Sequence, residues 1–206
     1  MPRAMKTTNL NTLHPMPPRG EKGAVLIIAL MFVVILTLLG VTAVMTTTME
    51  ERMAGNSRDL NVAFQAAEAA LRDAERDILC RNAAGTGTCT RTIPISGQTG
   101  AMDPTASSCS YCLPGIYLPA TSGDPTWVKK SLASGSSDSV AFGAYTGAGS
   151  ITGVAVQPRY LIEAIRVLPP GESLATRIYY YRITTRGFGA NANTQVTLQE
   201  VFRPFN

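Results

Sequence analysis

The chain has 206 residues and a formal net charge of +4, from 18 lysines and arginines against 14 aspartates and glutamates. Four of those basic residues and one of the acidic residues precede residue 24, so the remainder carries 14 basic and 13 acidic side chains and is nearly neutral. This balance argues against a nucleic-acid partner, because such binding needs clustered cations to replace the counterions of the phosphate backbone.

Residues 1–23 form a polar leader that contains four prolines, so we expect no folded unit there. Met1, Met5 and Met16 are alternative start positions, and the sequence does not choose among them. The basic residues of the leader are Arg3, Lys6, Arg19 and Lys22. Since cationic segments stay on the cytoplasmic side of a membrane, the pattern predicts that the leader remains inside and that the rest is exported.

An uncharged apolar stretch of about 22 residues, Ala24–Met45, follows the leader. As a helix it covers roughly 33 Å, enough to cross the hydrocarbon layer once. We therefore expect residues 24–49 to form a single membrane-spanning helix. A cleaved signal peptide, with the small residues Val41-Thr-Ala43 as its cleavage site, is the alternative. It fits less well, because its apolar region would be overlong and cleavage would divide one continuous helical pattern.

The helical pattern continues beyond residue 50 as an amphipathic segment. The stretch QAAEAALRDAER has strong helix propensity. Apolar residues recur at steps of three and four, at Leu60, Phe64, Ala67, Leu71, Ala74 and Ile78. This periodicity predicts one helix over about 24–79, roughly 84 Å long, whose stripe packs on its own domain. Gly40, Gly55 and Asn56 are the positions where it could bend or loosen.

Residues 82–153 are rich in Gly, Ser, Thr and Pro and predict long loops, with a short strand near Val140–Tyr145. The four cysteines of the chain are Cys80, Cys89, Cys109 and Cys112. In an exported domain they predict two disulfides, and three pairings are possible. A zinc site is the alternative, but the nine-residue spacing of Cys80 and Cys89 is not typical of zinc ligands. One interpretation pairs Cys80 with Cys89 and Cys109 with Cys112.

The last quarter of the chain predicts an antiparallel sheet. Three segments rich in β-branched and aromatic residues, 159–168, 178–187 and 194–202, are separated by turn sequences. Val196, Leu198 and Phe202 share one face of the last strand and can cover the helix. The predicted fold class is α+β: one long N-terminal helix, a long irregular αβ region, and a C-terminal antiparallel sheet.

Particular segments resemble a known family. The stretch TTTMEERMAGNSRDLNVAFQAAEAALR at 46–72 is similar to the PilX family of type IV pilus assembly minor pilins. The stretches YRITTRGFG from Tyr181 and VTLQ from Val196 are similar to it as well. Gly23 stands at the junction of leader and apolar run, as in type IV pilins. Residues 82–153 show no such similarity.

The resemblance implies a processing route and a set of partners. A prepilin peptidase would cut between Gly23 and Ala24 and methylate the new amine of Ala24, leaving residues 50–206 as a periplasmic globular domain. A missing Cβ suits close approach of a protease to the backbone. The implied partners are other minor pilins, the major pilin, a large tip adhesin and the inner membrane. After assembly the subunit would be part of an extracellular pilus that serves cell adhesion and twitching motility.

One position departs from the pilin pattern. Major pilins carry a glutamate at the fifth mature position, which is Ile28 here. In the filament that carboxylate is thought to neutralise the N-terminal ammonium of a neighbouring subunit, and a buried unpaired ammonium is costly. A subunit with nothing above it has no such amine to neutralise. The departure therefore suggests a subunit that primes assembly at the tip, unless Ile28 is simply another lipid-facing residue.

Other classes of function find less support. No histidine follows His14, which removes the common nucleophile–histidine and histidine–metal arrangements. The sequence contains no calcium-binding loop of the D-x-D-x-D-G kind. We therefore expect no catalytic residue, metal or cofactor. A minor pseudopilin of type II secretion and a permanently anchored periplasmic binding module are the alternative functions.

Overall fold

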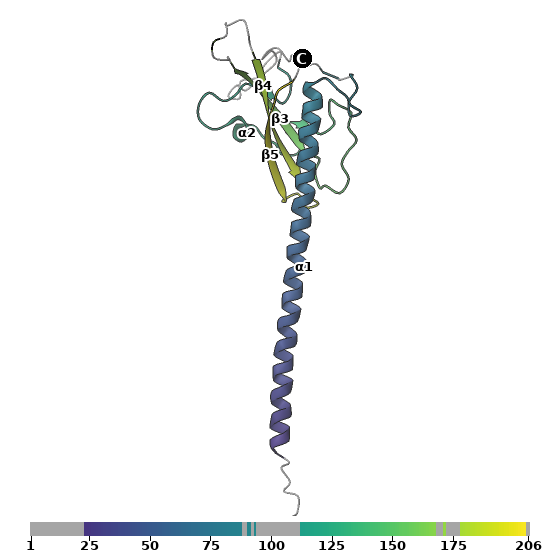
Figure 1. Ribbon diagram of the computed structural model, residues 1–206, viewed down its shortest axis with the longest axis vertical. Coiled ribbons are helices and arrows are strands. Elements are labelled where there is room, and N and C mark those ends of the chain that lie inside the picture. Colours follow the sequence, from purple (N-terminus) through teal and green to yellow (C-terminus); the bar gives the residue numbers. More distant parts are fainter. Residues whose placement is uncertain are drawn as a thin grey trace, which may run out of the picture. The chain divides into compact units, whose positions relative to one another are not determined.

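The computed structural model describes residues 23–87, 90–91, 93, 112–167, 171 and 178–204. It is an α+β structure (Figure 1). In chain order the elements are α1 (Ala24–Ile78), β1 (Ile116–Tyr117), α2 (Thr126–Lys129), β2 (Val140–Ala141), β3 (Arg159–Val167), β4 (Ile178–Phe188) and β5 (Gln195–Phe202). The chain divides into two compact units between Glu51 and Arg52, which we describe separately.

Helix α1 confirms the predicted long helix, ending one residue before the predicted boundary. The helical conformation is uninterrupted at Gly40, Gly55 and Asn56, where we had expected possible bends. A Cβ added at Gly40 or Gly55 would meet nothing within 4 Å. These two glycines therefore lie on open helix surface and mark neither a break nor a close contact within the chain.

Strands β3, β4 and β5 form the predicted antiparallel core of the sheet. Their bounds agree with the predicted segments to within a residue, and the register pairs Ile162 with Ile183 and Thr184 with Gln199. The complete sheet is mixed, however, because β1 pairs with β3 in parallel, Ile116 opposite Ile162. The three predicted C-terminal strands are antiparallel as expected, whereas the parallel pairing of β1, which comes from the middle region, was not predicted. A strand of two residues carries no periodicity of its own, so only its partner makes it a strand.

In its described residues, the irregular middle region consists mainly of loops and turns, as predicted, with the short elements β1 and α2 in addition. The predicted strand near 140–145 is present only as β2, which pairs antiparallel with β3. The residues after β2 form turns, and Gly143 has a φ of +76°. A Cβ at Gly143 would lie 2.2 Å from the carbonyl oxygen of Ala148, so this turn requires a glycine.

The hydrophobic core lies between the C-terminal part of α1 and one face of the sheet. Ala74 and Ile78 from α1 are fully buried there. Phe202 of β5 packs against the same cluster, as predicted for that face of the last strand. The sheet residues buried in the cluster are Ile116, Val140, Tyr160, Ile162, Ala164, Tyr179, Tyr181 and Ile183.

The face of α1 that packs on the sheet differs from the predicted stripe. Leu60 and Phe64 are 50% and 43% exposed, whereas Ala63, Ala66, Ala67 and Ala70 are buried. The prediction was wrong for these two large residues, although Ala67, Ala74 and Ile78 do face the sheet. The reason is a close approach of backbones, since small side chains alone fit between α1 and β4 at this level.

Gly187 of β4 makes that close approach possible. A Cβ at Gly187 would lie 2.1 Å from the carbonyl oxygen of Ala63 and 2.4 Å from the amide nitrogen of Ala67. Two residues earlier on the strand, the hydroxyl of Thr185 donates a hydrogen bond of 3.1 Å to the carbonyl oxygen of Ala67. The contact therefore joins the two backbones directly and selects alanine on the facing side of the helix.

Candidate assembly surfaces

The predicted cleavage junction lies at the start of α1. Gly23 is an exposed turn residue and Ala24 is the first helical residue. A Cβ added at Gly23 would meet nothing within 4 Å. The described residues therefore place no steric demand for glycine here, which agrees with a demand that comes from an enzyme binding the junction.

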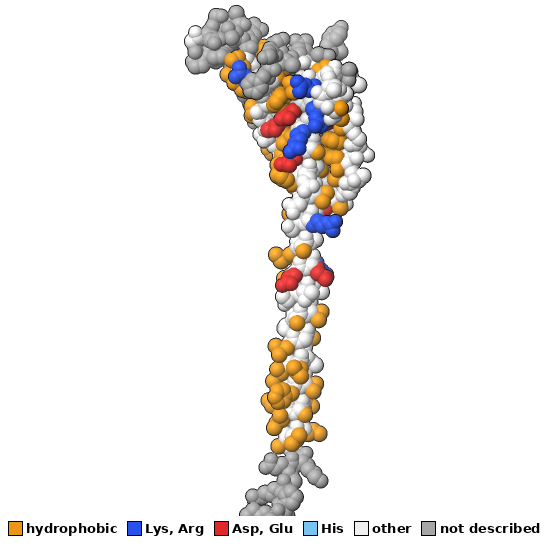
Figure 2. All heavy atoms as spheres, turned by 45° about the vertical axis from the view of Figure 1, so that its right-hand side comes forward, with side chains coloured by type: hydrophobic (Ala, Val, Ile, Leu, Met, Phe, Trp, Pro, Cys, Tyr) orange, Lys and Arg blue, Asp and Glu red, His pale blue; other side chains and the backbone are white. Residues whose placement is uncertain are grey.

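The first half of α1 exposes a continuous apolar surface. The large hydrophobic side chains between Val25 and Met45 are between 48% and 70% exposed. Figure 2 shows apolar side chains gathered over this segment. Among the described residues, α1 is a helix that is both long enough and apolar enough to cross a membrane. Because so much apolar surface is unfavourable in water, the segment indicates membrane anchoring.

The threonine hydroxyls of this apolar half donate hydrogen bonds to backbone carbonyl oxygens of the same helix. Thr37 donates to the carbonyl oxygen of Val34 at 2.8 Å, and Thr46 donates to that of Thr42 at 3.0 Å. Thr42, Thr47 and Thr48 make the same kind of bond three or four residues back. A polar group without a partner is expensive in hydrocarbon or in a packed helical bundle. These bonds let the segment carry threonine in either environment.

Ile28 lies one turn after Ala24 on the same apolar surface and is 53% exposed. Since the residues around it on α1 are also apolar, the helix surface offers no charge to an incoming ammonium at this level. The structure thus places Ile28 where a neighbouring helix could contact it.

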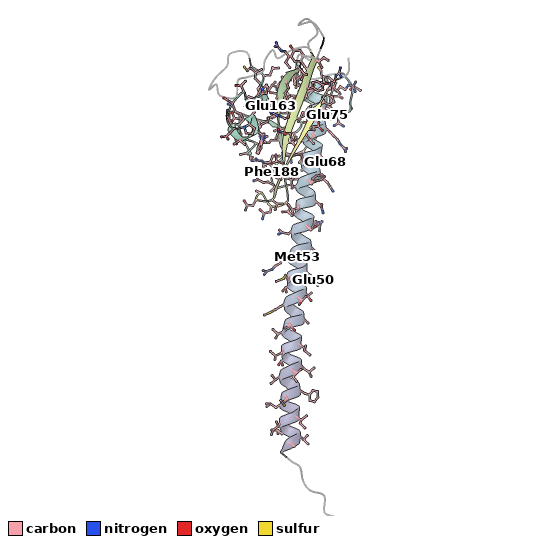
Figure 3. The ribbon with its side chains drawn as sticks, turned by 60° about the vertical axis from the view of Figure 1, so that its left-hand side comes forward. Glu50, Met53, Glu68, Glu75, Glu163 and Phe188 are labelled. Atoms are coloured by element: carbon pink, nitrogen blue, oxygen red, sulfur yellow. The ribbon has the colours of Figure 1, made fainter. Side chains whose placement is uncertain are left out.

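Two flanks of α1 remain uncovered within the second unit. On one flank Met53, Leu60 and Phe64 are 69%, 50% and 43% exposed. Figure 3 shows the Met53 side chain projecting away from the helix. On the other flank a groove with a cavity volume of about 1010 Å³ is lined by helix residues such as Gly55, Val62, Ala66 and Ala69 and by the loop 151–154. The domain thus leaves both a ridge and a groove along its helix.

Asp59 ties this part of the helix to the turn between β4 and β5. Its Oδ1 accepts hydrogen bonds from the backbone N–H groups of Ala190, at 2.6 Å, and Asn191, at 3.4 Å. The hydroxyl of Thr194 contributes most to lowering the pKa of Asp59 below its usual value. A Cβ at Gly189 would lie 2.4 Å from Oδ1, so the turn approaches the carboxylate closely.

The end of α1 is held by a buried charged cluster around Asp77. The guanidinium of Arg91 donates from Nε to Oδ1 at 3.0 Å and from Nη2 to Oδ2, and the hydroxyl of Tyr160 donates to Oδ2 at 2.8 Å. Arg91 also donates to the carbonyl oxygen of Pro114 at 2.6 Å and stacks 3.8 Å above the ring of Tyr145. Burial and the neighbouring Asp77 raise the pKa of Tyr160 well above its usual value.

Asp73 makes a second connection one turn earlier. It is fully buried and accepts hydrogen bonds from the backbone N–H of Gly143, at 2.8 Å, and from the hydroxyl of Thr146. Burial is the main cause that raises the pKa of Asp73. Sequence reasoning missed both aspartates, because a carboxylate between buried alanines is recognised only when its partners from distant segments are known.

A pair of glutamates stands at the contact of α1 with β5. Oε1 of Glu200 is buried without a hydrogen-bond partner among the described residues, and the carboxyl group of Glu75 lies beside the same side chain. Figure 3 labels Glu75 on the part of α1 that runs beside the sheet. Burial, and then the charge of Glu75, raise the pKa of Glu200 to about 7.

This pair predicts a pH-dependent stability. Because the folded pKa of Glu200 is raised, folding binds a proton, and stability falls as the pH rises from about 4.5 through about 7. We expect Glu200→Gln to raise the free energy of unfolding at pH 8 by on the order of 1 kcal/mol, since solvent screens a half-exposed group, and to change little at pH 4. Thermal unfolding at both pH values measures this. The control Glu51→Gln, at an exposed helix position, should leave the pH dependence of the free energy of unfolding unchanged. If Glu200→Gln shows the same pH dependence as the unaltered chain, the prediction is contradicted.

The cysteines are only partly described. Neither Cys80 nor Cys112 is a free thiol. Cys80 has a positive φ of 54° just after α1, so the chain turns sharply there. Cys89 and Cys109 lie outside the described residues, and the pairing remains a prediction.

Among the described residues there is no group of three or more histidine, cysteine, aspartate or glutamate side chains that could hold a metal ion. The buried carboxylates Asp73, Asp77 and Glu163 each have a hydrogen-bonding partner from a distant segment. Arg182 donates two hydrogen bonds to Glu163, each of 2.7 Å. These groups connect elements of the domain.

An exposed apolar half-helix that continues into the core helix of an α+β domain defines a pilin-like subunit. The family comparison agrees with this class: residues 22–72 match the PilX N-terminal family, and residues 77–204 match the C-terminal part of the type IV pilus assembly protein PilX. The chain belongs to the PilX family of type IV pilus assembly proteins. Searches of curated proteins and of solved structures each return no match.

Proposed function

We propose that this chain is a minor pilin that primes assembly of the type IV pilus and occupies its tip or a position near it. The observation that carries the proposal is the family match over both the helix and the domain. The exposed apolar half of α1 supports it, because such a surface suits lipid first and the helices of other pilins afterwards. The partners would be other minor pilins, the major pilin and a large tip adhesin.

In this proposal the leader stays in the cytoplasm and the domain from about residue 50 faces the periplasm, as the basic leader favours. The prepilin peptidase removes residues 1–23 and methylates Ala24. The apolar half of α1 then leaves the membrane and packs among other pilin helices, and the domain becomes part of an extracellular filament. The threonine hydroxyls, which donate hydrogen bonds within their own helix, support this transfer because they need no outside partner in either environment.

The mass of the mature N-terminus tests the processing step. We expect purified chain to begin at a methylated Ala24, and Gly23→Val to leave the leader uncut because a branched side chain hinders extended binding of the junction to the protease. Mass spectrometry of the N-terminal peptide gives the answer. An intact leader in the unaltered chain would indicate a permanently anchored module, and a start beyond Val44 a cleaved signal peptide; either would contradict the proposal.

Ile28 tests the position in the filament. If the missing carboxylate restricts this chain to the tip, labelled protein should be detected at filament ends, and Ile28→Glu should allow it to enter the shaft because it can then pair with a neighbouring ammonium. Electron microscopy of labelled pili from cells expressing each form measures this, with Ile28→Leu as the matched apolar control. Finding the unaltered chain along the whole shaft would contradict the proposed tip position.

We also propose that the four cysteines form two disulfides in the exported domain, with Cys80–Cys89 and Cys109–Cys112 as the pairing. The absence of free thiols at Cys80 and Cys112 supports disulfide formation in this domain. Peptide mapping without reductant tests the pairing. Loss of a native disulfide typically costs about 2–5 kcal/mol in small secreted domains, so we expect Cys80→Ala to lower the melting temperature of the domain.

A further inference from the structure

A second surface of the domain lies beside α2, away from α1. A pocket of about 410 Å³ is formed there by Trp127, Lys129, Lys130, Asp138 and Arg186, with Val128, Ser131 and Leu132 completing the wall. Trp127 is the only tryptophan of the chain and is 37% exposed. The pocket thus combines a partly exposed aromatic side chain with several charges.

The sheet register places Arg186 on the outer face of the sheet. Its neighbours along β4, Thr185 and Gly187, face α1, so the side chain of Arg186 points to the opposite side. There it lies between Arg159 of β3 and Thr197 of β5, which are its register partners. The pocket is therefore separated from α1 by the sheet.

The charge of this pocket is only partly compensated. Asp138 is 3.8 Å from Lys130 and accepts a hydrogen bond from the backbone N–H of Ser131. Arg186 has no carboxylate partner among the described residues and donates only a long bond of 3.4 Å to the hydroxyl of Thr197. Lys129 donates to the carbonyl oxygen of Ser122 at 3.0 Å and likewise has no described carboxylate partner.

The remaining charges nearby do not compensate Arg186. Arg159 adds another cation and donates from Nε to the hydroxyl of Ser139 at 2.8 Å. Glu163, the carboxylate on the same face of β3, is fully buried and engaged in its two bonds with Arg182. The cations of the pocket therefore exceed its one carboxylate, which favours an anionic ligand.

We propose that this pocket binds an acidic sugar, a uronic-acid residue of a polysaccharide. The apolar face of a sugar ring stacks on Trp127, the ring carboxylate accepts hydrogen bonds from Arg186 and Lys129, and Asp138 accepts from a ring hydroxyl. A volume of about 410 Å³ lies within the usual range of small-ligand sites.

The geometry favours a sugar over an acidic peptide. An extended peptide commonly docks by pairing its backbone with a free strand edge. Arg186 belongs to β4, whose two edges are already paired with β3 and β5, so no free edge adjoins this residue. A sugar needs no such edge, because it is bound through its ring face, its hydroxyls and its carboxylate.

The tryptophan provides a direct test with the full-length chain in detergent. Titration with trigalacturonate should change the fluorescence of Trp127, and calorimetry should give the same affinity. We expect Arg186→Gln to weaken binding about tenfold, because a charge-assisted hydrogen bond is lost, and about 0.5 M salt to weaken it further. The matched control is Arg166→Gln, which removes the same charge from the other face of the sheet, and it should bind as the unaltered chain does.

Each outcome decides the proposal. Binding of trigalacturonate that is weakened about tenfold in Arg186→Gln, and weakened in Trp127→Ala as measured by calorimetry, with circular dichroism showing folded protein, supports it. Equal binding of a neutral trisaccharide, preference for a hexaglutamate peptide, equal weakening by Arg166→Gln, or no response by fluorescence and calorimetry would overturn it. The result is independent of leader processing and of filament position, so it can fail while the proposed pilus function stands.

Discussion

Gly187→Ala is expected to lower the free energy of unfolding of the domain by about 3 kcal/mol, measured by thermal or denaturant unfolding of the full chain in detergent. A strand position ordinarily gains from such a change, since glycine is a poor strand residue. Here the added Cβ would lie 2.1 Å from the carbonyl oxygen of Ala63 and 2.4 Å from the amide nitrogen of Ala67. Both are backbone atoms and cannot rotate aside, so β4 must move away from α1.

The matched control for this prediction is Gly55→Ala on α1 itself. A Cβ at Gly55 would meet nothing within 4 Å, so the change should add helix propensity and raise stability by up to about 1 kcal/mol. Opposite signs for the two glycines would establish that space between backbones decides the outcome. A melting temperature of Gly187→Ala equal to that of the unaltered chain would show that the helix and sheet do not approach as closely as described.

Asp77→Ala is expected to cost about 3–5 kcal/mol, because it leaves the buried guanidinium of Arg91 without its counter-charge. The side chains of Arg91 and Asp77 are 5% and 0% exposed, so water cannot replace the lost partner. The hydroxyl of Tyr160 loses its acceptor as well. Chemical unfolding of the full chain measures the loss.

Two companion variants make the Asp77 prediction specific. Asp138→Asn removes the carboxylate of the ion pair with Lys130, whose groups are 3.8 Å apart and partly exposed, and should cost less than about 1 kcal/mol. In the double variant Asp77→Leu with Arg91→Met both buried charges are absent, so we expect it to be more stable than Asp77→Ala alone. If Asp77→Ala costs no more than Asp138→Asn, the cluster does not hold the end of the helix.

These contacts bear on assembly because they decide which parts of α1 remain available. Gly187, Asp59, Asp73 and Asp77 hold one side of the helix on the domain. The exposed ridge of Met53, Leu60 and Phe64 and the groove beside Ala66 and Ala69 are left uncovered. The packing among other pilin helices that we propose needs such surfaces.

The sequence by itself determined the features that rest on local patterns. An uncharged span defines the apolar half of α1, Ala-rich periodicity extends that helix to Ile78, and β-branched and aromatic runs define β3, β4 and β5. The motifs at 46–72 and from Tyr181 indicated the family that the comparison shows. Each of these signals is complete within a few tens of residues, so it needs no knowledge of distant partners.

Only the tertiary structure decided which side of the helix is buried and what its charges bind. Leu60 and Phe64 fit the apolar stripe, yet the approach of Gly187 admits only alanine there. Asp73 and Asp77 look like surface residues, yet Thr146, Arg91 and Tyr160 make their burial possible. Strand β1 exists because β3 offers it a partner. In each case the deciding contact joins segments far apart in the chain, so a local sequence pattern cannot predict it.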